Sequence, residues 1–190
     1  MKWLLGELGI TADVAVVNVF AGEGRTPAYQ AVHPHGFVPA LEDEGVTLIE
    51  SGAICMYLTD RYGEGKGLAP KPGTLERGKY YEWMVYVPAT VDPCLEAIMF
   101  NTMFLPEEKR DAKLVLRMKK TWATKIEPRF IAALSTSPFI LGETFSTADV
   151  MAGNALAWAR MAGTLGDDPA LARYLDAMAS RPAFLEGHAS

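Results

Sequence analysis

Two residues have the types and the spacing that most favour chemistry. One is a proline at the start of a short apolar stretch, and the other is a serine at the start of a predicted helix. Pro39 lies in the stretch Val38–Leu41. Proline opens a strand only where no ladder donor is needed, and a cis bond costs little before proline. A cis Val38–Pro39 bond would turn the N–H and C=O groups of Val38 outward, where they can pair with an extended peptide by strand addition. A turn proline at an edge strand is the alternative, and Pro39 alone favours it.

Ser51 follows Glu50 at the point where a predicted strand ends and a predicted helix begins. A serine at such a position commonly caps the helix by accepting a hydrogen bond from its first turn, and Ser51 alone favours that role. The same free N–H groups and the helix dipole also bind carboxylates. Taken together, Pro39, the hairpin and Ser51 place a peptide-pairing edge beside an anion pocket. A small peptide with a free carboxylate would match both.

Short, mixed elements are predicted to position these residues. The hydrophobic pattern and the Gly and Pro positions predict a helix over 2–9 ending at Gly9, a buried strand over Val14–Phe20, a loop over 21–36 with a short helix near Ala28–Val32, a hairpin of Val38–Leu41 and Val46–Ile49, and a helix over Ser51–Tyr62. The stretch 64–73, rich in Gly and Pro, cannot continue a helix and predicts a linker.

Everything after this linker is predicted to be helical. The expected elements are a long helix over Glu76–Phe104 interrupted near Pro88 and Pro93, a helix opened by Leu105–Pro106, a helix over Val150–Met161 that follows a capping box of Ser146 and Asp149, and a last helix over Pro169–Ala179. The fold class is therefore α+β followed by α. A small α/β domain over 1–63 precedes the linker over 64–73, and an all-helical domain covers 74–190.

Composition excludes several classes of protein. The chain has 18 basic and 23 acidic residues, for a net charge of −5, and neither half is basic, so nucleic-acid binding is disfavoured. Its two cysteines, Cys55 and Cys94, lack metal-ligand spacing, which predicts no metal site, no disulfide framework and a cytoplasmic location. No apolar run approaches the ~18 residues of a membrane span, and the first residues do not resemble a signal peptide.

The residues quoted above resemble a known family. Val-Pro-Ala-Leu at 38–41, Leu-Ile-Glu-Ser at 48–51, the Gly/Pro linker, Glu76-Arg77 and Phe-Ser-Thr-Ala-Asp at 145–149 together resemble the cytosolic glutathione transferases of bacterial type. The resemblance covers about residues 2–185. It implies a thioredoxin-like domain followed by a helical domain, and a homodimer.

The resemblance also implies roles for individual residues. Val38 would pair with the cysteinyl backbone of glutathione, Pro39 would be a cis proline, and Glu50 and Ser51 would hold the γ-glutamyl end. Phe37 stands where the family often has Lys or Gln, so His35 becomes a candidate for the glycyl carboxylate, against the alternative of a solvated loop histidine. Further along the chain, Tyr86 and Met99 would line the site of a hydrophobic co-substrate.

The family's first strand and its catalytic Tyr, Ser or Cys fall before Met1, so the catalytic residue of this chain is unknown. The sheet closes differently, another segment fills the gap, or Met1 is an internal methionine of a longer natural protein. We expect the last, with a strand-like segment of roughly 5–10 residues encoded upstream.

Two main functions are therefore expected. The first is an enzyme that binds glutathione as co-substrate and conjugates its thiol to small hydrophobic electrophiles, with isomerisation, dehalogenation or thiol-dependent reduction as related reactions. The second is a non-catalytic glutathione-binding or dimerisation module. A distant third is a helical adaptor that uses the basic stretch 109–129 for an acidic partner.

Overall fold

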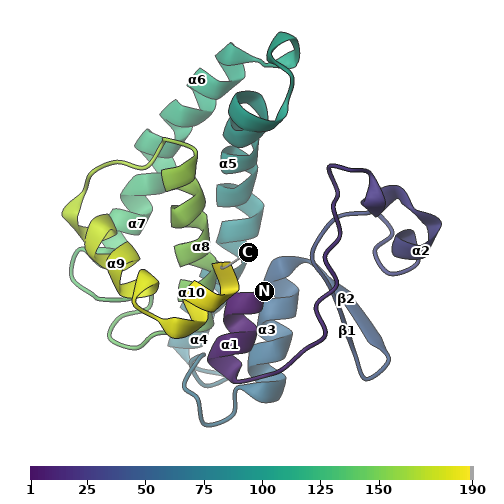
Figure 1. The fold of residues 1–190 in the computed structure, drawn as a ribbon. Helices are drawn as coiled ribbons and strands as arrows, with labels where there is room; N and C mark the ends of the chain where they lie inside the picture. The colour runs from purple at the N-terminus through teal and green to yellow at the C-terminus, as the bar shows by residue number, and fades with distance from the viewer. Residues whose placement is uncertain (189–190) are drawn as a thin grey trace.

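The first third of the chain contains short elements and one small sheet, and the rest is helical (Figure 1). The structure, a computed structural model, describes residues 1–188. The first part consists of α1 (Lys2–Leu8), α2 (Pro27–Gln30), β1 (Ala40–Asp43), β2 (Val46–Ile49) and α3 (Ser51–Tyr62). The helical part consists of α4 (Leu75–Tyr86), α5 (Asp92–Met99), α6 (Ala112–Thr121), α7 (Glu127–Leu134), α8 (Thr147–Met161), α9 (Pro169–Ala179) and α10 (Pro182–His188). A small α/β part followed by helices confirms the predicted fold class.

The hairpin forms as predicted and is held against α3. Strands β1 and β2 pair antiparallel from Ala40–Ile49 to Asp43–Val46. The turn between them has positive φ at Glu44 and Gly45, which matches the right-handed twist of the two strands. The carboxylate of Asp43 accepts hydrogen bonds from the hydroxyls of Tyr57 (2.9 Å) and Tyr62 (2.6 Å) on α3. These bonds fix the angle at which the hairpin meets the helix.

The predicted strand Val14–Phe20 is wrong. The segment 10–18 has neither helix nor strand, and Val16 is 82% exposed. In Figure 1 this segment runs from the end of α1 past the hairpin to α2. Within residues 1–188 the sheet has only β1 and β2. An apolar, β-branched stretch becomes a strand only when a neighbouring strand takes its backbone hydrogen bonds, and here it has none.

The two prolines expected to interrupt the long helix are accommodated within it. Helix α4 continues through a π-helical turn at Val87–Val91 into α5, and a second π-helical turn at Phe100–Phe104 ends the run. A π-helical turn shifts the backbone hydrogen-bonding pattern, so the helix can continue although Pro88 has no N–H group to donate. The helix predicted to open at Leu105–Pro106 begins later, because Asp111 caps α6 by accepting from the N–H of Leu114 (2.9 Å).

Helix α8 lies at the centre of the helical part, and its start is the predicted capping box. The fully buried carboxylate of Asp149 accepts from the backbone N–H groups of Ser146 (2.8 Å) and Ile140 (2.8 Å) and from the hydroxyl of Tyr174 (3.1 Å). Burial raises the pKa of Asp149, and these hydrogen bonds oppose that rise. Asp149 is thus a structural residue that ties the loop before α8 to α9.

The two parts of the chain are bound together by buried polar contacts and by close helix packing. The hydroxyls of Thr59 and Thr147 lie 2.6 Å apart, and the buried Arg77 donates to Asp60 (2.6 Å). Helix α10, which no sequence pattern predicted, packs on α1 so closely that a Cβ on Gly187 would lie 2.7 Å from the backbone nitrogen of Trp3. The first part is therefore held rigidly against the helices.

Two further features are absent from the part of the chain that the structure describes. Across residues 1–188, no helix combines the length and apolar character that a membrane crossing requires. The same residues hold no group of three or more His, Cys, Asp or Glu side chains arranged to bind a metal ion.

Candidate functional site

The corner before β1 carries a backbone edge that is open for pairing. The peptide bond between Val38 and Pro39 is cis, the conformation that the family resemblance implies. Val38 is 49% exposed, whereas Pro39 is half-buried. Within residues 1–188 the N–H and C=O groups of Val38 take part in no hydrogen bond. This edge is available to an extended peptide.

The loop before this corner is fixed by its own contacts. The hydroxyl of Tyr29 donates to the carbonyl of Phe37 (2.7 Å). His33 is buried, and its Nδ1 accepts a hydrogen bond from the backbone N–H of His35 (3.3 Å). The ring of His35 is exposed and lies 6.2 Å from that of Phe37. His35 therefore presents an exposed imidazole in the loop just before Val38, while the buried His33 has a structural role.

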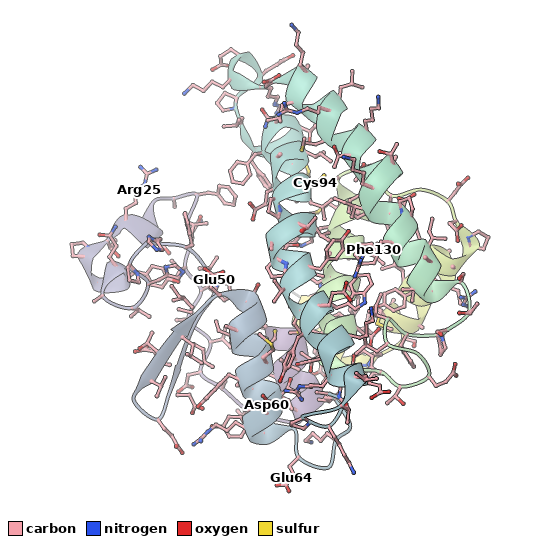
Figure 2. The ribbon with its side chains drawn as sticks, turned by 180° about the vertical axis from the view of Figure 1, so that it is seen from behind. Arg25, Glu50, Asp60, Glu64, Cys94 and Phe130 are labelled. Carbon is pink, nitrogen blue, oxygen red and sulfur yellow. The ribbon has the colours of Figure 1, made fainter. Side chains whose placement is uncertain are left out.

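Glu50 and Ser51 form the second half of the site, at the start of α3. Glu50 has a φ of 75°, a conformation that side chains other than glycine rarely adopt. Such a position costs energy and is a common feature of ligand-binding sites. No side chain caps α3, so its first N–H groups and the hydroxyl of Ser51 are open to an anion. Figure 2 shows Glu50 between the hairpin and the long α4–α5 helix.

Gly52 brings the start of α3 against the helical part. A Cβ at Gly52 would lie 2.7 Å from the carbonyl oxygen of Met84 and 3.4 Å from Cγ of Pro88. Only glycine therefore allows α3 to approach α4 this closely. The consequence is that the N-terminal end of α3 faces the π-helical turn that contains Pro88.

The cysteine near this corner has the environment of a packed, structural thiol. Cys55 lies one turn into α3 from Ser51 and is 2% exposed, and burial raises the pKa of its thiol to about 11. A thiol with such a pKa carries almost no thiolate at neutral pH. Its sulfur lies 3.7 Å from that of Met1, so Cys55 packs between α3 and α1.

The two residues expected to line a hydrophobic subsite lie apart from this corner. Tyr86 packs against Trp83 and Phe130, with the guanidinium of Arg129 4.5 Å above its ring. Met99 is buried in the core, at 6% exposure. The structure therefore brings neither of them beside Ser51.

A group of exposed aromatic rings was missed by the sequence analysis. Phe20 stacks on Phe104 with ring centroids 4.9 Å apart, and Phe100 lies 5.7 Å from Phe104. All three are more than 40% exposed. They bridge the loop before α2 and the end of the long helix. The signal was present in the spacing of Phe100 and Phe104, which places both on one helical face.

A separate cavity of about 550 Å³ lies between the segment 67–70, α4 and the loop 137–146. None of the residues discussed above for peptide or anion binding lines it. Its place in the fold therefore gives it no part in the site at the start of α3.

Comparison with known proteins places this geometry in context. Residues 1–66 match the sequence model described as "Glutathione S-transferase, N-terminal domain", and residues 128–177 match "Glutathione S-transferase, C-terminal domain". The site at Val38–Ser51 lies within the first of these matches. The Val38 edge and the start of α3 are therefore part of the segment that resembles the N-terminal domain.

Individual relatives show the same likeness. Glutathione S-transferase PM239X14 of Arabidopsis thaliana is 30% identical over 149 residues, which cover 76% of this chain and 68% of the relative. Maleylacetoacetate isomerase of Pseudomonas aeruginosa is 31% identical over 169 residues, 88% of this chain and 78% of the relative. A theta class glutathione S-transferase of Xanthomonas axonopodis pv. citri, solved with glutathione bound, is similar with a TM-score of 0.84 and 28% identity, covering 100% of this chain and 90% of that one.

Proposed function

Because the chain belongs to the glutathione S-transferase family, we propose that it binds glutathione and adds the glutathione thiol to small hydrophobic electrophiles. The observation that carries the proposal is that two sets of unpaired backbone groups lie at one corner. The backbone of Val38 is unpaired within residues 1–188, and the start of α3 has no side-chain cap. A peptide with a free carboxylate engages both. Glutathione, which is such a peptide, is bound in the similar Xanthomonas protein.

Each group at the corner has a proposed part in holding glutathione. Val38 pairs with the cysteinyl backbone of the tripeptide, next to the turn made by Pro39. Glu50 and Ser51 hold the γ-glutamyl end, where the carboxylate meets the first N–H groups of α3. The exposed His35 meets the glycyl carboxylate. The glutathione-binding part is then residues 1–63, joined by residues 64–73 to the helical part.

The proposed chemistry depends on lowering the pKa of the bound thiol. A free cysteine thiol has a pKa of about 8.5, and only the thiolate is an effective nucleophile. Adding the thiolate to an electrophilic carbon gives a conjugate. The same addition followed by elimination of glutathione gives an isomerisation, which is the activity named for the Pseudomonas relative. Both reactions use one bound thiolate.

The hydrophobic partner is proposed to bind on the helical side. Tyr86 and Met99 were expected to line this subsite, and Tyr86 is only half-buried, which leaves a ring edge to contribute. The exposed rings of Phe20, Phe100 and Phe104 offer a larger apolar surface. Burying such rings is worth about 1.5–3 kcal/mol each, so they favour an apolar substrate.

We further propose a homodimer in the cytoplasm. Tyr81 and Val85 lie on α4 with 45% and 55% exposure, which leaves an apolar strip open for a second copy. Cys55 and Cys94 are both free and buried, as is usual for proteins of a reducing compartment. Sedimentation of the purified chain tests the dimer.

The proposal is tested by binding and turnover with the same preparation. Glutathione is titrated by calorimetry, and conjugation is then assayed with a model aryl halide. Binding with turnover supports the transferase, binding without turnover favours the non-catalytic module, and absence of binding overturns the proposal.

A single substitution tests the pocket. Ser51→Ala should weaken glutathione binding by ~1–2 kcal/mol, because it removes one hydrogen bond to a charged group. Ser180→Ala is the matched control, since the exposed hydroxyl of Ser180 donates to the carbonyl of Ala177 (2.8 Å) at the C-terminal end of α9. Equal affinities for both variants would show that Ser51 does not touch glutathione.

A further inference from the structure

One carboxyl group in the long helix has an unusual environment. Asp92 is the first residue of α5, between Val91 and Pro93, and is partly buried. Considering residues 1–188, its carboxylate takes part in no hydrogen bond or ion pair. Carboxylates that are partly withdrawn from water are normally paired. A structural role accounts for Asp149, which has four such bonds, but not for Asp92.

The helix geometry shows which way Asp92 faces. Cys94, two residues later, contacts the carbonyl of Met118 on α6 at 3.4 Å. Two residues correspond to about 200° of rotation around a helix, so Asp92 points away from α6. Pro88, one turn earlier, packs against the place where a Cβ of Gly52 would be. Asp92 therefore lies one turn beyond Pro88 on the side of the helix that faces the start of α3.

Within residues 1–188 no salt bridge joins Asp92 to a cation. Burial is the main cause that raises its pKa, to about 7, and Glu96 one turn along the helix adds repulsion. The other titratable or charged groups on the elements packed against this stretch are Glu76, Arg77, Lys79, Tyr80, Tyr81, Glu82 and Tyr86 on α4, Cys55, Tyr57, Asp60, Arg61 and Tyr62 on α3 with Glu50 just before it, Asp149 and Arg160 on α8, and Lys113, Arg117, Lys119 and Lys120 on α6. The cations of α6 lie on the side that Cys94 faces, so they do not pair with Asp92.

We propose that Asp92 is a further acid–base residue of the thiol chemistry, which accepts the proton of bound glutathione and passes it on. The proposal rests on the proposed function, because it requires glutathione at the Val38–Ser51 corner. An unpaired carboxyl group that faces this corner from the helical side is placed to meet the thiol rather than either carboxylate of the tripeptide. General acid–base groups work best with a pKa near the working pH.

The proton balance of the step is complete. The carboxylate of Asp92 takes the thiol proton, which leaves a thiolate and a neutral carboxylic acid. With an aryl halide, the thiolate forms the carbon–sulfur bond, the halide leaves with the electron pair of its bond, and Asp92 releases the proton to water. In an isomerisation, the thiolate adds and is later expelled, and the same carboxylic acid first protonates the carbon skeleton and then recovers the proton.

The test compares pH profiles of the purified full chain. Conjugation of glutathione to a model aryl halide is measured across the range around neutrality for wild type and Asp92→Asn. Wild type should show a kcat/KM that rises with pH through about 7. Asp92→Asn should lose that rise and about 100-fold in kcat/KM above pH 7, with an unchanged calorimetric Kd for glutathione.

Two further variants separate chemistry from packing. Glu96→Gln removes an equal charge one turn away, so it should keep the maximal rate and move the rise to lower pH. Asp92→Glu keeps a carboxyl group, so it should be faster than Asp92→Asn and should keep the dependence of the rate on pH. The proposal is overturned if Asp92→Asn keeps the wild-type pH profile. It is also overturned if Glu96→Gln loses as much kcat/KM as Asp92→Asn does. A wild type that fails to bind glutathione would instead overturn the proposed function.

Discussion

The burial of Asp92 has a cost in stability that Asp92→Asn should remove. The pKa of Asp92 is raised from 3.8 to about 7, a difference of about 3 units. One unit corresponds to about 1.4 kcal/mol, so the ionised carboxylate destabilises the fold by at most about 4 kcal/mol above neutral pH. Asparagine has nearly the same volume and no charge, and it should recover much of this free energy.

The sign of the pH dependence follows from proton binding. Between about pH 4 and pH 7 the folded chain holds a proton on Asp92 that the unfolded chain has lost. Stability attributable to this group is therefore fully present below the unfolded pKa and is lost as the pH rises through about 7. The advantage of Asp92→Asn should grow by about 2 kcal/mol between about pH 5.5 and about pH 8.5.

Urea unfolding of both proteins at several pH values, followed by circular dichroism, measures the difference. Glu64→Gln is the control, because it removes a charge from an exposed position in the linker region. Its stability curve should run parallel to that of wild type. If the Asp92→Asn and wild-type curves also run parallel, the carboxyl group is not desolvated, and the reasoning about its pKa fails.

Two other substitutions test the framework of the site. Asp149→Ala leaves the buried N–H groups of Ile140 and Ser146 without an acceptor, and at about 1–3 kcal/mol each unfolding in urea should show a loss of about 2–6 kcal/mol. A loss below about 1 kcal/mol would mean that water replaces the carboxylate. Gly52→Ala places a Cβ 2.7 Å from the carbonyl oxygen of Met84. It should cost about 1–3 kcal/mol and weaken glutathione binding by calorimetry, and unchanged affinity would show that the start of α3 does not depend on this contact.

Local signals in the sequence were sufficient for elements that depend on neighbouring residues alone. The positive φ at Gly9 and the capping box at Ser146 and Asp149 are fixed within a few residues of chain, and each was predicted. The hairpin and α3 were predicted for the same reason. The strand Val14–Phe20 failed because pairing depends on a neighbour that no local pattern specifies.

Longer-range packing explains the other differences. Pro88 was expected to interrupt a helix, but α8 and α3 both pack against the π-helical turn that contains it, and the helix continues through that turn. Helix α10 is short and has no strong hydrophobic pattern, so its existence depends on the contacts of Gly187 and Ala183 with α1. Neither feature can be read from propensity, because tertiary contacts override weak local preferences.

The same distinction applies to the candidate site. Val38, Pro39, Glu50 and Ser51 could be selected from sequence because each stands at a boundary between elements. Asp92 could not, since an acid within an apolar helix is equally compatible with a solvated face and with a buried one. Its direction depends on the contact of Pro88 with α3 and of Cys94 with α6.

The two expected effects of Asp92→Asn have one physical origin. Removal of the carboxyl group from water raises its pKa and lowers the stability of the fold. The same desolvation brings the pKa into the range where a carboxylate can accept a thiol proton near neutral pH. A chain under selection for stability alone would carry an apolar or amide side chain at this position. The substitution should therefore make the protein more stable and less active, and a variant that lost both properties would show that Asp92 serves packing rather than proton transfer.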